Sequence, residues 1–104
     1  MKNLLHIYAQ EAWHDSAFIV GDIEALCQLK FALERALERN LAVSDHFVDD
    51  GEGFQVRIML ALPETMEQLC VPYTDEMAKA KGGLDPEVLF LSMKNTYGGI
   101  ANDR

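Results

Sequence analysis

Residues 11–16 place several reactive side chains in six consecutive positions, Glu-Ala-Trp-His-Asp-Ser. His14 and Asp15 have the types of a general base and its orienting carboxylate, and Ser16 has the type of a nucleophile. A catalytic triad requires such side chains to converge in space, whereas consecutive residues point in different directions. No G-x-S-x-G sequence surrounds Ser16. We therefore predict a loop rather than a reaction centre, and we assign no catalytic residue.

The histidines and one acidic stretch are the candidates for metal binding. His6, His14 and His46 show neither H-x-H nor H-x-x-x-H spacing, and a zinc site needs three converging ligands. Residues 44–53, SDHFVDDGEG, superficially resemble a calcium-binding loop. The first, third and twelfth ligand positions of such a loop would be His, Val and Arg, which do not suit calcium. We interpret this stretch as a hairpin turn and predict neither a metal ion nor a cofactor.

The elements that position these residues begin with a β-hairpin. Residues 4–9 alternate in period two, residues 16–20 form a second β-type run, and the connection between them contains the reactive stretch. Asp22 then stands at the N-cap of a helix over residues 23–39. A second hairpin follows, with strands over 42–48 and 54–62 around the turn at 49–53.

Apolar periodicity predicts which side chains face the core. In the helix the expected buried stripe has three-and-four spacing and comprises Ile23, Leu26, Leu29, Leu33, Ala36 and Leu37. In the last strand the alternation predicts inward side chains at Phe54, Val56, Ile58 and Leu60. Gln55 and Arg57 are then expected to point outward.

The C-terminal part changes to helices. Pro63 starts a short helix over 63–69, Thr74 begins another that ends before Gly82, and a final helix runs from Asp85–Pro86 to Tyr97. We predict one α+β domain over residues 1–104, with the sheet and long helix in 1–62, the helical part in 63–99 and a frayed tail at 100–104. Its four-stranded, mainly antiparallel sheet has ββαββ order and is covered by the long helix.

The two cysteines and the absence of long apolar runs bear on location. Cys27 and Cys70 stand 43 positions apart and match no zinc motif, so we interpret both as small buried hydrophobic residues. No apolar run reaches the length of a membrane span, and the first residues lack the apolar core of a secretory signal. We expect a cytoplasmic protein that does not bind membranes.

Charge provides the strongest indication of function. Nine basic and seventeen acidic residues give a net charge of −8, which disfavours binding to nucleic acid. Residues 1–53 alone carry ten acidic and four basic residues. We expect Trp13 to fold onto the sheet as a lid, and the alternative is an exposed interface anchor. The candidate partner-binding residues occupy the two hairpins and are Trp13, His14, Asp15, Asp45, Asp49, Asp50 and Glu52.

These features favour a small acidic module that binds a protein. In size and charge the chain matches the format of bacterial immunity proteins, so the leading hypothesis is an antidote that neutralises a basic protein such as a nuclease toxin. A second hypothesis is a small enzyme or a ligand- or metal-binding subunit that uses His14, Asp15 and His46 in a shared pocket. A third is an accessory protein that forms a homodimer through a strand edge or the helical tail.

Overall fold

The computed structural model describes residues 2–76 and 82–97 and has the α+β class predicted. Along the chain the elements are β1 (Leu5–Tyr8), β2 (Phe18–Gly21), α1 (Ile23–Arg39), β3 (Leu41–Phe47), β4 (Gly53–Met59), α2 (Pro63–Gln68) and α4 (Pro86–Tyr97). The short helix predicted to begin at residue 74 runs into residues 77–81. Those residues and the predicted frayed tail lie outside the described residues.

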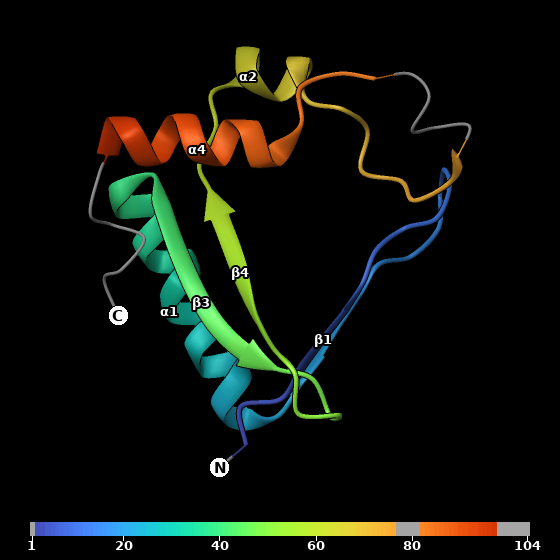
Figure 1. Cartoon of the computed structure of the whole chain (residues 1–104), viewed down its shortest axis with the longest axis vertical. Helices are drawn as coiled ribbons and strands as arrows, with labels where there is room; N and C mark the ends of the chain where they lie inside the picture. The colour runs from blue at the N-terminus through green and yellow to red at the C-terminus, as the bar shows by residue number, and fades with distance from the viewer. Residues whose placement is uncertain (1, 77–81, 98–104) are drawn as a thin grey trace.

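The prediction of a single four-stranded sheet is wrong. The four described strands form two antiparallel pairs, β1 with β2 and β3 with β4. An isolated parallel bridge between Leu4 and Phe47 joins them. Because this bridge lies just before β1 and at the last residue of β3, the two strands meet at one end and do not pair along their length. Figure 1 shows the resulting divergence of the β1–β2 hairpin from the β3–β4 hairpin.

Helix α1 has the predicted bounds and caps. The Asp22 carboxylate accepts a hydrogen bond from the Ala25 backbone N–H at 2.8 Å, which satisfies one of the free amides at the helix start. At the other end Asn40 adopts a left-handed conformation with φ of 78°, and its N–H donates to the Ala36 carbonyl at 2.8 Å. Asparagine tolerates this conformation better than most residues, so it suits the helix terminus.

The buried face of α1 differs from the predicted stripe. Of the six predicted residues only Leu29 and Ala36 are buried, and Ala25 and Ala32 complete the buried face. These small side chains let the helix approach the strands closely and pack against Leu5 and Ala42. Apart from Leu29, the larger members of the predicted stripe are exposed, and Ile23 is 70% exposed. Cys27 is exposed as well and Cys70 is only half-buried, which corrects their interpretation as buried residues.

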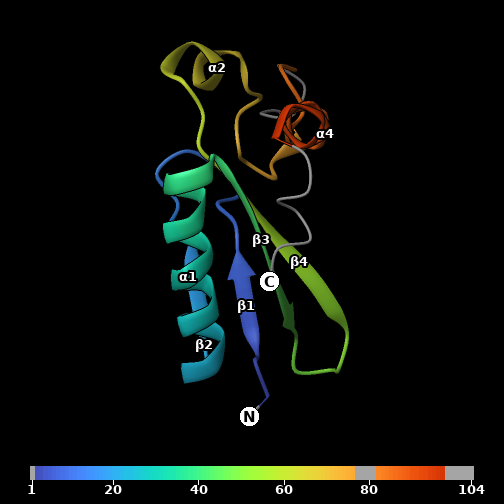
Figure 2. The same cartoon turned by 90° about the vertical axis from the view of Figure 1, so that its left-hand side faces the viewer.

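The β3–β4 hairpin is covered on both faces. Phe54, Val56 and Ile58 pack against the α1 side, as their alternation predicts. The inward prediction for Leu60 is wrong, because this residue lies beyond the end of β4 and is 44% exposed. On the opposite face the Arg57 guanidinium lies 4.2 Å from the centre of the Phe90 ring on α4. Arg57 also donates to both Glu87 carboxylate oxygens at 2.9 Å. Figure 2 shows α1 and α4 on the two sides of these strands.

Backbone hydrogen bonds connect the C-terminal part to itself and to the first hairpin. The N–H of Leu84 donates to the Gln68 carbonyl at 2.7 Å, which joins the segment before α4 to the end of α2. The N–H groups of Thr74 and Asp75 donate to the carbonyls of Gln10 and Glu11. The far end of the β1–β2 hairpin is therefore attached to the chain that follows α2.

Candidate functional site: two surface loops and a buried polar network

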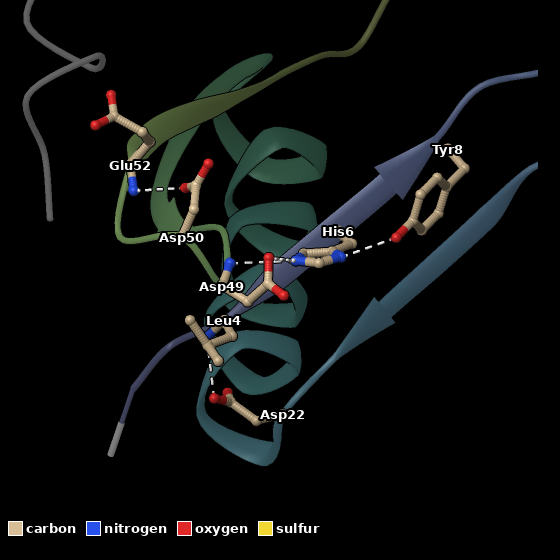
Figure 3. A network of polar contacts seen from close by, with 7 residues as sticks. All are labelled: Leu4, His6, Tyr8, Asp22, Asp49, Asp50 and Glu52. Atoms are coloured by element: carbon tan, nitrogen blue, oxygen red, sulfur yellow. Dashed lines mark hydrogen bonds and ion pairs between the residues drawn. The ribbon is translucent and has the colours of Figure 1, made fainter.

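The turn between β3 and β4 carries three exposed acidic residues, Asp49, Asp50 and Glu52. Two backbone hydrogen bonds close the turn, from Val48 N–H to the Glu52 carbonyl and from Gly51 N–H to the Val48 carbonyl. Gly51 has φ of 95°, a conformation that favours glycine. The Asp50 carboxylate also accepts from the Glu52 N–H at 3.0 Å. The carboxylates are therefore held on an ordered turn, as Figure 3 shows.

Strand β1 supports this turn through His6. Its Nε2 atom lies 3.3 Å from the Asp49 backbone nitrogen and 3.3 Å from an Asp49 carboxylate oxygen. Its Nδ1 atom lies 2.8 Å from the Tyr8 hydroxyl, which fixes the ring orientation. A neutral His6 accepts from the Asp49 amide, whereas a protonated His6 donates to the carboxylate. Either form attaches the acidic turn to β1.

The loop between β1 and β2 holds Trp13, His14 and Asp15. Trp13 is 62% exposed, so the expectation that it folds onto the sheet as a lid is wrong. The Asp15 carboxylate accepts from the Ala12 N–H at 3.1 Å, and the Asp15 N–H donates to the Ala12 carbonyl. These are contacts of a loop that stabilises itself. His14 adopts φ of 66° and stays exposed, so this stretch forms the connection that the sequence predicts.

The two loops lie at opposite ends of β1. His6, near the start of β1, contacts the acidic turn, whereas Trp13 lies beyond the other end of the hairpin (Figure 1). The carboxylates of the turn therefore do not surround Trp13. Asp45 belongs to neither loop because it lies half-buried within β3. The seven candidate residues thus form two separate groups and one isolated position.

A buried polar network joins the N-terminal segment to β3. His46 is 1% exposed, and its Nδ1 atom lies 2.8 Å from the Asn3 side-chain oxygen. Its Nε2 atom lies 2.5 Å from the Ser44 hydroxyl oxygen. The Asn3 side-chain nitrogen donates to the Asp45 carbonyl at 2.7 Å. Each buried polar side chain therefore has a partner, which is the usual condition for burying such groups.

The order of hydroxyl, imidazole and amide in this network resembles that of a hydrolytic triad. Ser44 contributes to the wall of a groove of about 490 Å³ between α1 and β3. However, Ser44 is only 5% exposed and His46 is buried, so a substrate atom does not reach the hydroxyl in this conformation. We assign the network to structure rather than to catalysis. His14 lies at the hairpin tip, so His46 and His14 share no pocket.

Two ionisable groups at the junction of β1, α1 and β3 are perturbed. Burial lowers the pKa of His46 below its ordinary value, and the nearby Asp22 carboxylate opposes this effect. The pKa of Asp22 is lowered because its carboxylate accepts backbone hydrogen bonds from Leu4 and Ala25. His46 is therefore kept neutral and Asp22 ionised over the neutral pH range.

Within residues 2–76 and 82–97 no group of three or more His, Cys, Asp or Glu side chains has the arrangement of a metal site. None of the helices in this part of the chain is long and apolar enough to cross a membrane.

No family model, curated protein or solved structure matches this chain. The roles of Asn3 and His6 were not predicted, because each depends on a contact with a residue 43 positions away. The role of Ser44 was not predicted either, because its contact with His46 in the same strand matters only once β3 is buried.

Proposed function

We propose that this chain is an acidic protein-binding module of the immunity or antidote type. In this proposal it acts in the cytoplasm and neutralises a basic protein, such as a nuclease toxin, by direct binding. The observation that supports it best is the ordered β3–β4 turn, which presents Asp49, Asp50 and Glu52 to solvent. Carboxylates on an ordered turn lose little conformational entropy on binding. They also complement the cationic surface with which a nuclease holds phosphates.

Trp13 is the second element of the proposal. Exposed tryptophan side chains often anchor protein interfaces, because they bury a large apolar area with few rotatable bonds. Since Trp13 lies away from the acidic turn, both surfaces serve one partner only if that partner extends along the β1–β2 hairpin. Trp13→Ala is then expected to weaken binding at least about fivefold, which corresponds to about 1 kcal/mol.

The test is capture by the immobilised chain at low and high salt from cells that contain it. A variant with Asp49→Asn, Asp50→Asn and Glu52→Gln removes three negative charges from the turn. The matched control, Glu34→Gln, Glu38→Gln and Glu67→Gln, removes three from exposed helix positions. We expect the wild type and the control to retain a basic protein and to inhibit its activity on nucleic acid, and the turn variant to do neither.

Two results contradict this proposal. One is capture of no basic protein by the wild type at low salt. The other is equal capture and inhibition by the turn variant and the wild type, which would remove the acidic turn from the interface.

A further inference from the structure

Strand β2 is an unprotected edge. In the described part of the chain it pairs only with β1, and β1 in turn is bridged to β3. The Asp22 N–H donates to the Leu4 carbonyl, so the alternation of an antiparallel pair directs the N–H groups of Ile19 and Gly21 away from β1. Phe18–Gly21 contains no lysine and no proline. Natural edge strands usually carry such residues because they discourage pairing with another chain.

Both faces of the β1–β2 hairpin carry exposed apolar side chains. The register places Ile7 opposite Ile19 on one face, and Tyr8 opposite Phe18 on the other. Each of these four side chains is about half exposed or more. A two-stranded hairpin with uncovered faces is marginally stable by itself in water. The hairpin therefore has the character of an element that is completed by association.

The exposed apolar surface borders the free edge of β2. It comprises the hairpin side chains and the adjoining first turns of α1, namely Ile7, Tyr8, Phe18, Ile19, Val20, Ile23 and Leu26, which are 42% to 70% exposed. The hairpin side chains lie on both of its faces, and a strand added along β2 lies beside Phe18, Ile19 and Val20.

The lack of charged side chains on strands β1 and β2 indicates which kind of partner this surface suits. The two strands contain no carboxylate, and His6 is their only ionisable side chain apart from the Tyr8 phenol. A basic protein gains no electrostatic attraction here. Two copies of a chain with net charge −8 repel each other elsewhere, but antiparallel pairing of Phe18–Gly21 with the same strand of a second copy places no two carboxylates opposite each other within the paired strands. The uncharged edge therefore suits a second copy of the chain.

We infer that two copies of this chain associate by antiparallel pairing of β2 with β2 of the second copy, which forms a four-stranded sheet of order β1-β2-β2-β1. A strand that pairs antiparallel with itself generates a two-fold axis, so the assembly closes as a dimer. The acidic turn contacts β1 through His6 and lies outside this interface. A test of the dimer can therefore fail without affecting the proposed function, and the reverse also holds.

The test is the molar mass of the chain by light scattering, over about a hundredfold range of protein concentration. We expect the wild type to approach twice the mass of one chain at high concentration. Ile19→Lys places a charge in the centre of the edge strand and is expected to weaken dimerisation at least about tenfold. Leu37→Lys makes the same change of charge at a 69% exposed position near the end of α1, and it is expected to dimerise like the wild type. Circular dichroism confirms that both variants are folded.

Hydrogen exchange of the wild type provides a second measurement that needs no variant. The amides of Ile19 and Gly21 are expected to exchange more slowly at concentrations at which the dimer forms. The inference is overturned by a wild type that stays a monomer throughout. It is equally overturned by an Ile19→Lys dimer as tight as that of the wild type, or by exchange at these amides that is independent of concentration.

Discussion

The substitution His46→Leu removes the centre of the buried polar network. In the wild type both ring nitrogens have partners, one on Asn3 and one on Ser44. Leucine fills a similar volume but offers neither partner a hydrogen bond. The Asn3 side-chain oxygen and the Ser44 hydroxyl are then left buried and lose a partner.

The expected cost follows from these two groups. Each buried polar group without a partner destabilises the folded state by about 1–3 kcal/mol, so the variant with two such groups is expected to lose ~2–6 kcal/mol of unfolding free energy. A domain of this size has ~5–15 kcal/mol in total. Ser44→Ala adds a sign test. In the wild-type background Ser44→Ala removes a hydrogen-bond partner from His46 and lowers the unfolding free energy by about 1 kcal/mol. In the His46→Leu background it removes a buried hydroxyl that has lost its partner, and it raises the unfolding free energy by about the same amount.

Urea unfolding followed by far-ultraviolet circular dichroism measures these free energies. His14→Asn is the control, because it removes an imidazole from an exposed position whose left-handed conformation asparagine tolerates. It is expected to change stability by less than about 0.5 kcal/mol. A loss for His46→Leu as small as that for His14→Asn would show that the buried network contributes little to stability. A Ser44→Ala effect of the same sign in both backgrounds would contradict the predicted change of sign.

Three further predictions follow from single contacts. Burial lowers the pKa of His46 in the folded chain. As the pH falls below about 6.5, the unfolded chain therefore binds more protons than the folded chain does. The wild type therefore loses stability at acidic pH, whereas His46→Leu, which lacks this imidazole, does not lose it in this way. Urea titrations at successive pH values should show that the difference in unfolding free energy between the two proteins becomes smaller as the pH falls. Gly83 has φ of 125° and an added Cβ would lie 2.7 Å from backbone, so thermal unfolding of Gly83→Ala should show a larger loss than that of Gly51→Ala, where space is open. Glu87→Gln weakens the half-exposed pair with Arg57 and should cost less than about 1 kcal/mol, with a smaller loss at high salt in the same urea assay.

Local sequence signals predicted the elements well. The Asp22 cap and the apolar periodicity gave the bounds of α1, and period-two alternation identified the hairpins and the inward face of β4. These features depend on residues within a few positions of one another. The same signals define the final helix, which begins at Pro86 and ends at Tyr97 as predicted.

Features that depend on distant contacts were not predictable. The face of α1 was assigned from its large apolar residues, whereas close packing selects Ala25 beside Leu5 of β1. The same close packing selects Ala32 and Ala36 beside Ala42 of β3. The single sheet failed because one bridge, Leu4 to Phe47, sets the offset between the hairpins. The His46 network joins residues 43 positions apart, and no sequence pattern signals such a contact.

The separation of the candidate residues into two groups also depends on contacts between distant parts of the chain. Its loops are hairpin connections, and alternation identifies the strands without fixing the direction in which each hairpin extends. The offset between β1 and β3 places the acidic turn at one end of the first hairpin and Trp13 beyond the other.

In the proposed function the association rate of the captured basic protein depends on the electrostatic attraction of the acidic turn. Stopped-flow mixing with the wild type, the turn variant and the helix control, at several salt concentrations, isolates electrostatic attraction. We expect the association rate of the wild type to fall at least about tenfold from low to high salt. We also expect a turn variant that is slower at low salt and less salt-dependent than the control. Equal rates for the turn variant and the control at every salt concentration would contradict the proposed role of the acidic turn.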